Sequence, residues 1–547
     1  MPETSSRVLV DRTVVRLDGR PFFAFGPRVL LTPPARYGEV LASLAAHGFT
    51  AVGSPPVSEG TLPLIEDFFD AAERAKLMVL LIADSRLPEH GHYLAERFRQ
   101  RASLLGYLLP PPNSPNQIPR HLAERDAIRA QDLFHPIFCP LPEECWDARW
   151  FGSQDVYTPV VPTGMAAGGR RLAQMPGARA RALQNALGKS PQRPVFCTDL
   201  LAVTGDEERA LGLYDDDPAV AAHSRRRIEW FPYLTNLGTT SRRDLLGPFP
   251  ELVRLQLFDV LMAGGRGIFL DFLECMQGVA PGTGRDRLLE LAIIGQEIAA
   301  LKDFLAEGRP AEIEVDSGHP RLDCVAIQHG LETLLLLRMN GYEEEYFVDE
   351  GFLERTEVSV LWRQPGALNA WRLDFPAPRR LEFIRDQSGS IRILAGEVEL
   401  TCAILLTPGQ QRVDEISASM AQRLEAVAQW AVEAAAIRLA KTTAIESEML
   451  ALGVGMDNRD RLRAVEGKLA EARAAMANRA WAEAYGHARW VTRYIRQLVK
   501  YQMAKALAMP VMERNGLRTH LRNSYFTLPR FYRENQVETA RAFADLT

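Results

Sequence analysis

The sequence predicts an α/β protein: a (β/α)8 TIM barrel followed by an all-β sandwich domain and a C-terminal α-helical bundle. Three observations lead to this prediction. Strand-like and helix-like segments alternate over residues 7–307, apolar and polar residues alternate over 310–407, and the chain beyond 413 is rich in alanine with helical apolar spacing. At 547 residues the chain is long enough for several domains of the usual ~100–200 residues.

The barrel prediction rests on eight strand-like segments with helices between them. Residues 7–17 form a short β-hairpin, and the turn Asp18-Gly19 leads into the first strand at 21–26. Further strands are expected at 50–52, 78–82, 104–109, 136–138, 154–157, 194–197 and 267–270. Helices are expected at 35–47, 62–75, 92–102, 117–132, 169–187, 251–263 and 286–307. Eight strands favour a closed barrel over an open sheet.

The remaining chain divides into two further domains and a tail. We place the barrel at 1–308, the sandwich at 309–410, a three-helix bundle at 411–509 and an extended tail at 510–547. Sandwich strands are expected at 323–328, 333–340, 357–361, 381–384, 391–394 and 398–406, and bundle helices at 417–452, 459–477 and 480–509.

Composition limits the classes of partner. The chain has 69 acidic and 64 basic residues, so its net charge of −5 gives no reason to expect nucleic acid. The six cysteines are scattered, which favours buried thiols, and no metal or cofactor is predicted. No uncharged apolar run reaches about 18 residues, so membrane insertion is not expected. Without an apolar leader the chain as written is expected to be cytoplasmic, or extracytoplasmic if it is an excised piece of a longer precursor.

Several motifs in the barrel region share an order with a known family. They are Asp18-Gly-Arg-Pro-Phe-Phe, Leu44-x-x-His-Gly-Phe-Thr-Ala-Val52, Leu105-Gly-Tyr-Leu-Leu-Pro-Pro-Pro-Asn113 and Gly264-Gly-Arg-Gly-Ile-Phe269. Together they resemble clan A glycoside hydrolases, which are retaining (β/α)8-barrel enzymes such as the β-galactosidases. The resemblance covers about residues 7–307. It implies sugar chemistry at the carboxyl ends of the barrel strands.

The resemblance also places a proline at the position of the catalytic acid. The family's fourth strand ends roughly in Gly-Tyr-x-x-Asn/Asp-Glu-Pro, and here Pro110 and Pro111 replace the amide or carboxylate and the Glu. A proline side chain has no proton to give to a departing glycosidic oxygen. The segment Pro194-Val-Phe-Cys-Thr-Asp199 is similar to the family's Pro-Val-x-x-Gly-Glu. That similarity implies that Asp199 stands at the nucleophile position, with a side chain one methylene shorter.

A retaining mechanism needs a second carboxyl group about 5–5.5 Å from the nucleophile. Asp155 in the sixth strand and Glu143 on the loop after the fifth are the substitutes that the sequence offers. The expected substrate-binding residues are three aromatic rings that could stack on sugars or else pack in the core, and two aspartates that follow strands. They are Trp146, Trp150, Tyr157, Asp84 and Asp271.

The sequence therefore predicts a degenerate clan A-like glycosidase that recognises an oligo- or polysaccharide or has an architectural role. An active retaining glycosidase with Asp199 as nucleophile and a relocated acid is one alternative. A structural assembly component that uses the helical bundle for a protein partner or for self-association is another. Arg489, Arg493, Arg496 and Lys500 share one helix face, which is expected to be solvated unless it binds an acidic partner.

Overall fold

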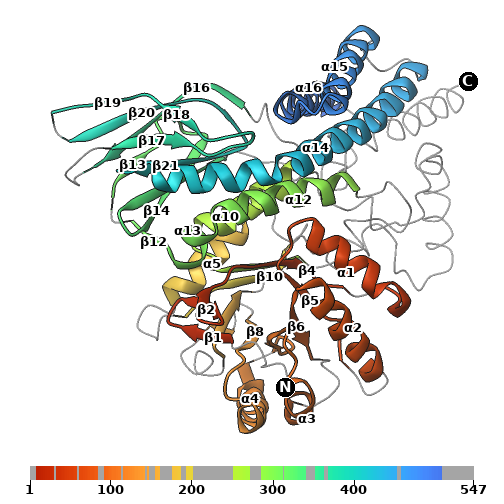
Figure 1. Ribbon diagram of the computed structural model, residues 1–547, viewed down its shortest axis with the longest axis vertical. Coiled ribbons are helices and arrows are strands. Elements are labelled where there is room, and N and C mark those ends of the chain that lie inside the picture. Colours follow the sequence, from red (N-terminus) through yellow and green to blue (C-terminus); the bar gives the residue numbers. More distant parts are fainter. Residues whose placement is uncertain are drawn as a thin grey trace, which may run out of the picture.

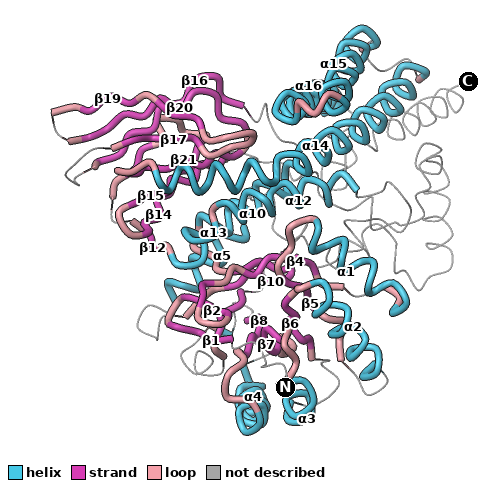
Figure 2. Tube along the Cα trace, viewed as in Figure 1, coloured by secondary structure: helices cyan, strands magenta, loops and turns pink. Residues whose placement is uncertain are grey.

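The structure is a computed structural model, and it describes most of the chain in sixteen ranges (Figures 1 and 2). These are residues 8–29, 32–57, 61–83, 91–112, 115–141, 145–146, 154–159, 175–186, 193–200, 250–270, 285–311, 313–340, 352–362, 368–387, 389–452 and 458–507.

A small antiparallel sheet precedes the parallel strands; its β1–β2 hairpin was predicted, whereas its third strand was predicted to begin the first parallel strand. It contains β1 (Val8–Asp11), β2 (Val14–Leu17) and β3 (Arg20–Pro21). Asp18 and Gly19 join β2 to β3 with φ angles of 51° and 78°, the left-handed pair that an Asp-Gly hairpin turn provides. The side chains of Val8 and Val15 are buried against Ala24 and Met78, the first residues of two parallel strands. The hairpin therefore covers the amino end of the parallel sheet.

Eight parallel strands are described, and each overlaps a predicted barrel strand. They are β4 (Ala24–Pro27), β5 (Ala51–Gly53), β6 (Met78–Ile82), β7 (Leu104–Leu108), β8 (Ile137–Leu141), β9 (Val156–Pro159), β10 (Phe196–Leu200) and β11 (Gly267–Leu270). They pair as a five-stranded sheet in the order β5-β6-β7-β8-β9 and a three-stranded sheet in the order β10-β11-β4. Bridges from Arg28 to Gly53 and from Tyr157 to Val195 link the two sheets. The strands thus form a curled parallel sheet.

Alternate residues of these strands face opposite sides of the sheet, as the two-residue period of a strand requires. Leu80, Phe138, Phe196 and Phe269 pack together on the inner side of the curled sheet. Their neighbours Val79, Cys139, Cys197 and Ile268 pack instead with the surrounding helices. Both faces are apolar, which is why these strands read as nearly continuous hydrophobic runs.

Helices surround the parallel sheet (Figure 1). They are α1 (Tyr37–Ala46), α2 (Leu62–Ala75), α3 (Gly91–Phe98), α4 (Ile118–Gln131), α5 (Met175–Ala186), α10 (Pro250–Met262), α12 (Arg285–Ala300) and α13 (Lys302–Glu307), with 3-10 turns η1 (Pro34–Arg36) and η3 (Pro115–Gln117). On α2, Ile65, Phe68, Phe69 and Ala72 form the buried stripe that helical spacing predicts. The single helix predicted at 286–307 is two helices, α12 and α13, separated at Leu301.

Two antiparallel sheets follow Gly308. The first has the order β12 (Arg309–Pro310), β14 (Leu322–His329), β15 (Glu332–Met339), β21 (Thr401–Thr407), β17 (Asn369–Arg372), β18 (Arg379–Leu381). The second has the order β13 (Val315–Asp316), β16 (Phe352–Leu361), β20 (Ser390–Glu399), β19 (Phe383–Arg385). Leu335 and Ile404 of the first sheet share a buried cluster with Val358 and Ile393 of the second. Each strand predicted between 323 and 406 overlaps an observed strand, but the one predicted at 381–384 is divided between β18 and β19, which belong to different sheets. The strands β12, β13 and β17 were not predicted.

Three long helices close the described chain: α14 (Gln411–Ala451), α15 (Arg459–Ala477) and α16 (Trp481–Leu507). Figure 1 shows α14 running alongside α12, and the two helices pack together. The prediction of a solvated arginine face on the last helix is wrong for three residues. Arg489 and Arg496 pair with Glu399 at 3.2 and 2.6 Å, and Arg493 pairs with Glu397 at 3.3 Å. Both glutamates lie near the end of β20, so the face is turned toward the antiparallel sheets.

One buried apolar cluster runs through all parts of the fold. Phe25 of β4, Leu291 of α12, Leu405 of β21 and Val427 of α14 belong to it. Because these residues come from the parallel sheet, the antiparallel sheet and the long helices, the parts share an interior. No helix in the described ranges is both long and apolar enough to cross a membrane.

Candidate functional site

The carboxyl end of β7 carries the proline run that the sequence singled out. Leu109 is buried, and its amide donates to the carbonyl oxygen of Phe138 at 2.9 Å. Beyond it, Pro110 is half-buried, Pro111 is exposed and Pro112 is buried. From 109 to 112 no side chain carries an exchangeable proton. This end of β7 therefore offers no general acid.

Trp146 lies just beyond the carboxyl end of the neighbouring strand, β8. Its indole Nε1 donates to the carbonyl oxygen of Leu141, the last residue of β8, at 3.0 Å. The ring is half-buried against the apolar cluster of the helices. This hydrogen bond fixes the indole at the carboxyl edge of the sheet and leaves part of its surface accessible. An indole held in this way can receive the apolar face of a sugar ring.

Asp199 is the fourth residue of β10 and lies toward the carboxyl end of that strand. The pairing of β10 with β11 shifts register between Cys197 and Leu200, so strand alternation does not assign a side to the residues between them. The side chain of Asp199 lies outside the described part of the structure. Its role as nucleophile stays a prediction.

The prediction for Asp155 as a relocated acid is wrong in its geometry. Asp155 precedes β9, and its carboxylate accepts a hydrogen bond at 2.9 Å from the amide of Ile137, the first residue of β8. It therefore lies at the amino end of the sheet, away from the end that Pro110 occupies. Its carboxylate is also paired with Arg129 and Arg193. These contacts hold the Asp155 carboxylate at the amino end of the sheet.

The prediction that Tyr157 offers a platform for sugar rings is also wrong. Its side chain is fully buried and packs with the residues that face the helices, because alternation along β9 puts Val156 on the inner side instead. The guanidinium carbon of Arg193 lies 5.9 Å from the ring centroid. Burial raises the pKa of the Tyr157 hydroxyl. A ring without exposed surface cannot stack on a ligand.

Four other predicted site residues are not placed by the structure. Glu143, Trp150, Asp84 and Asp271 lie outside the described residues. Among the predicted site residues whose side chains the structure describes, only Trp146 lies at the carboxyl edge with accessible surface.

Sequence reasoning missed a buried polar cluster behind β7. The hydroxyl of Tyr107 donates to Asp132 at 2.8 Å, and the Nδ1 of His135 lies 2.7 Å from the same carboxylate. Burial alone would raise the pKa of Asp132, but the His135 side chain and the amides of Phe134 and His135 outweigh it and hold this pKa at about 2. Asp132 also caps the turn that leads into β8, so this cluster positions the strand.

No cluster of three or more potential metal ligands from His, Cys, Asp and Glu occurs in the described ranges. The buried Cys139 lies 3.8 Å from the Nδ1 of His121. Burial lowers the pKa of His121 to about 4 and raises that of the Cys139 thiol, which are shifts opposite to those of a thiolate–imidazolium pair. This pair is therefore not an activated nucleophile.

No protein-family model matches the chain, and no curated protein matches it. Solved structures with a similar overall arrangement include one described as a glycoside hydrolase, with 13% identity and a TM-score of 0.48 over 74% of this chain and 97% of the other. A glycoside hydrolase family 5 protein from Bacteroides vulgatus has 13% identity and a TM-score of 0.48 over 73% and 93% of the two chains. A GH30 endoxylanase from Clostridium papyrosolvens has 9% identity and a TM-score of 0.39 over 75% and 98%. Scores and identities at this level leave the chain without an assigned family.

Proposed function

We propose that the chain is a carbohydrate-active protein that binds an oligo- or polysaccharide at the carboxyl edge of its parallel sheet and hydrolyses it slowly or not at all. The architecture we propose is a closed (β/α)8 barrel, a β-sandwich and a helical bundle, with boundaries near residues 308 and 410. The resemblance of the barrel region to clan A glycoside hydrolases motivates the class of ligand.

Closure of the barrel is supported by contacts at both junctions of the curled sheet. The amide of Val29 donates to the carbonyl oxygen of Gly53 at 3.0 Å, which joins the end of β4 to β5. The amide of Tyr157 donates to the carbonyl oxygen of Pro194 at 3.0 Å, which joins β9 to the segment before β10. Each of the eight strands then has a neighbour on both sides, as in a barrel.

The observation that carries the functional proposal is that Pro111 and Trp146 stand at the ends of two adjacent strands, β7 and β8. The end of β7 presents an exposed proline where the resemblance expects the acid, and the end of β8 presents a fixed indole. The proline cannot donate a proton to the leaving group, whereas the indole offers a surface suited to a sugar ring. Binding without efficient hydrolysis follows from the combination.

Titration calorimetry with a panel of neutral oligosaccharides tests this proposal. We expect at least one of them to bind, and Trp146→Ala to weaken that binding by roughly tenfold, the scale of one lost stacking contact. Trp490→Ala is the matched control, because Trp490 is also half-buried but lies on α16. Circular dichroism spectra check that both variants are folded. If no oligosaccharide binds, or if Trp146→Ala binds like the parent, the proposal is wrong.

A further inference from the structure

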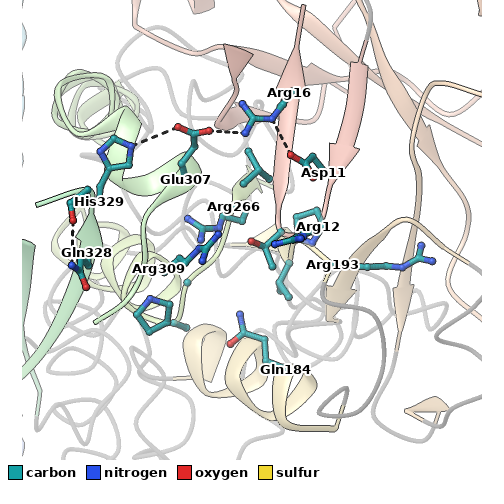
Figure 3. A pocket seen from close by; sticks show the side chains of 18 residues that line it. Asp11, Arg12, Arg16, Gln184, Arg193, Arg266, Glu307, Arg309, Gln328 and His329 are labelled. Carbon is teal, nitrogen blue, oxygen red and sulfur yellow. Dashed lines mark hydrogen bonds and ion pairs between the residues drawn. The ribbon is translucent and has the colours of Figure 1, made fainter. Parts of the chain in front are cut away.

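A cleft of about 1070 Å³ opens at the amino end of the parallel sheet, opposite the edge that carries Pro111 and Trp146 (Figure 3). The turn of the β1–β2 hairpin, the segments that lead into β10 and β11, the end of α13 and the β14–β15 turn form its walls. The cleft therefore lies where the barrel region meets the first antiparallel sheet.

Among the residues that the structure describes, five arginines and two carboxylates line this cleft. The arginines are Arg12, Arg16, Arg193, Arg266 and Arg309, and the carboxylates are Asp11 and Glu307. Both carboxylates already have cationic partners. Arg16 lies 2.8 Å from Glu307 and 3.4 Å from Asp11, and His329 lies 3.6 Å from Glu307. Arg193 is paired with Asp155, so the excess positive charge of the described lining comes from Arg12, Arg266 and Arg309.

Arg266 places one of these charges in the wall of the cleft without a direct ion pair in the described ranges. Its side chain is buried, and its guanidinium donates to two carbonyl oxygens, at 2.7 Å to Leu305 and also to Gly308. Within the described residues, no carboxylate lies within 4.0 Å of it. Burial, opposed by Glu307 and reinforced by the nearby charge of Arg309, lowers the pKa of Arg266 to about 10. A buried cation with only neutral partners favours binding of an anion.

Arg12 and Arg309 supply two exposed guanidinium groups in the same cleft, and Figure 3 shows both with Arg266. Neither guanidinium group forms an ion pair or hydrogen bond with another residue in the described ranges. Arg12 also occupies the β1–β2 turn with φ of 53°, a left-handed conformation that costs a residue with a side chain about 1–2 kcal/mol. An asparagine or glycine would fit this turn better.

We propose that this cleft binds an oxyanion, a carboxylate, sulfate or phosphate group, between the guanidinium groups of Arg12, Arg309 and Arg266. Planar guanidinium groups hold such oxygens in pairs of charge-assisted hydrogen bonds. The source is either a free oxyanion or the acidic groups of a charged oligosaccharide. Because the cleft and the carboxyl edge lie at opposite ends of the sheet, this site is independent of the sugar-binding surface proposed above.

Titration calorimetry on the full chain tests the site with three anionic probes: inorganic phosphate, inorganic sulfate and an oligogalacturonate. The double variant Arg12→Gln/Arg309→Gln removes the two exposed charges. Arg355→Gln/Arg385→Gln is the matched control, because these two exposed arginines lie outside the cleft, on β16 and β19. We expect at least one probe to bind, and the cleft variant to weaken it by roughly tenfold or more while the control binds as the parent does.

The probes also identify the source of the anion. Binding of phosphate or sulfate indicates a free oxyanion, and binding of oligogalacturonate alone indicates an acidic glycan. Affinity should fall as salt is added, and Trp146→Ala should leave it unchanged. If none of the probes binds at up to about 10 mM, or if the cleft variant binds as tightly as the parent, the inference is wrong. Neither result bears on oligosaccharide binding at the opposite edge.

Discussion

Arg254 on α10 contacts Glu290 on α12 through its Nε, at 2.6 Å from Oε1, and both side chains are buried. The terminal nitrogens of Arg254 also donate to Glu297 at 2.8 and 3.0 Å, and one of them to the hydroxyl of Thr401 on β21 at 3.3 Å. A single guanidinium thus connects two helices that pack around the parallel sheet with the first antiparallel sheet. The Arg254–Glu290 contact is part of the joint between these regions.

Removing Arg254 should be strongly destabilising. Arg254→Met leaves Glu290 and Glu297 in the interior without their main counter-charge, which typically costs about 3–5 kcal/mol. Arg463→Met is the control, because Arg463 and Asp460 form a pair at 3.3 Å whose side chains are 71% and 92% exposed. Exposed pairs of this kind contribute about 0–1 kcal/mol. Urea unfolding monitored by circular dichroism measures the stability of both variants. Equal unfolding midpoints for the two variants would contradict the prediction.

Stability should depend on the charge of Glu399. Burial alone would raise the pKa of this carboxyl, but Arg489 and Arg496 outweigh it and hold the pKa at about 2, below its ordinary 4.5. The charged carboxylate therefore stabilises the fold fully above about pH 4.5, and this contribution is lost as the pH falls toward 2. The difference between these two pKa values corresponds to at most about 3 kcal/mol in the free energy of unfolding.

The variant Glu399→Gln cannot titrate at this position. Between pH 5 and pH 3 the urea midpoint of the parent should therefore fall more steeply than that of the variant. Parallel profiles for the two proteins over this range would show that the pairing with Arg489 and Arg496 does not govern acid sensitivity.

The close approach of β4 to β5 makes Gly26 irreplaceable. A Cβ at Gly26 would overlap the backbone oxygen of Ala51, and neither strand can move without losing its pairing. Gly26→Ala should therefore cost several kcal/mol, about 3 or more, or prevent folding. On α1, a Cβ at Gly38 meets nothing within 4 Å, so Gly38→Ala should stabilise by about 0.5–1 kcal/mol. Thermal melting of the two variants checks the contrast, and a Gly26→Ala protein as stable as the parent would contradict the β4–β5 junction.

Hydrolysis should depend steeply on the leaving group. General-acid assistance contributes about 10²–10⁴ in rate, and an unactivated glycoside needs it most. Activated aryl glycosides should therefore be the better substrates, and Asp199→Asn should abolish any turnover of them if Asp199 is the nucleophile. Turnover of an ordinary disaccharide at about 1 s⁻¹ or faster would contradict the prediction and would make Glu143 the first replacement acid to test.

The strands were predictable because each is a short apolar run between polar segments. β7 and β11 begin and end within a residue of their predicted bounds. The bounds of β9 were harder, because Gln154 and Asp155 precede an apolar run without a break. A strand that starts two residues later leaves Asp155 before the strand, at the amino end of the sheet. The side that Tyr157 faces depends on the packing of β9, which places Val156 on the inner side, and a two-residue change of the boundary does not alter it.

Long-range contacts were beyond the reach of local patterns. Arg489 and Arg496 have the spacing of a solvated helix face, and nothing near them in sequence indicates that Glu399 lies opposite. The cleft could not be predicted for the same reason, since Arg12, Arg266 and Arg309 come from segments that are distant in the sequence. A local signal existed only for Arg12, because an arginine in a two-residue hairpin turn is unusual.

The burial of α12 has a consequence for how the chain is made. Twelve of its residues, from Asp286 to Ile298, are buried, and α14 covers part of the helix. α14 begins at Gln411, about 110 residues after α12 ends at Ala300. At roughly 5–20 residues per second, a ribosome needs about 5–20 s to bridge that interval. During this time the nascent chain presents the α14-facing side of α12 to the surrounding medium, where a chaperone or a second nascent chain can reach it before its own partner helix does.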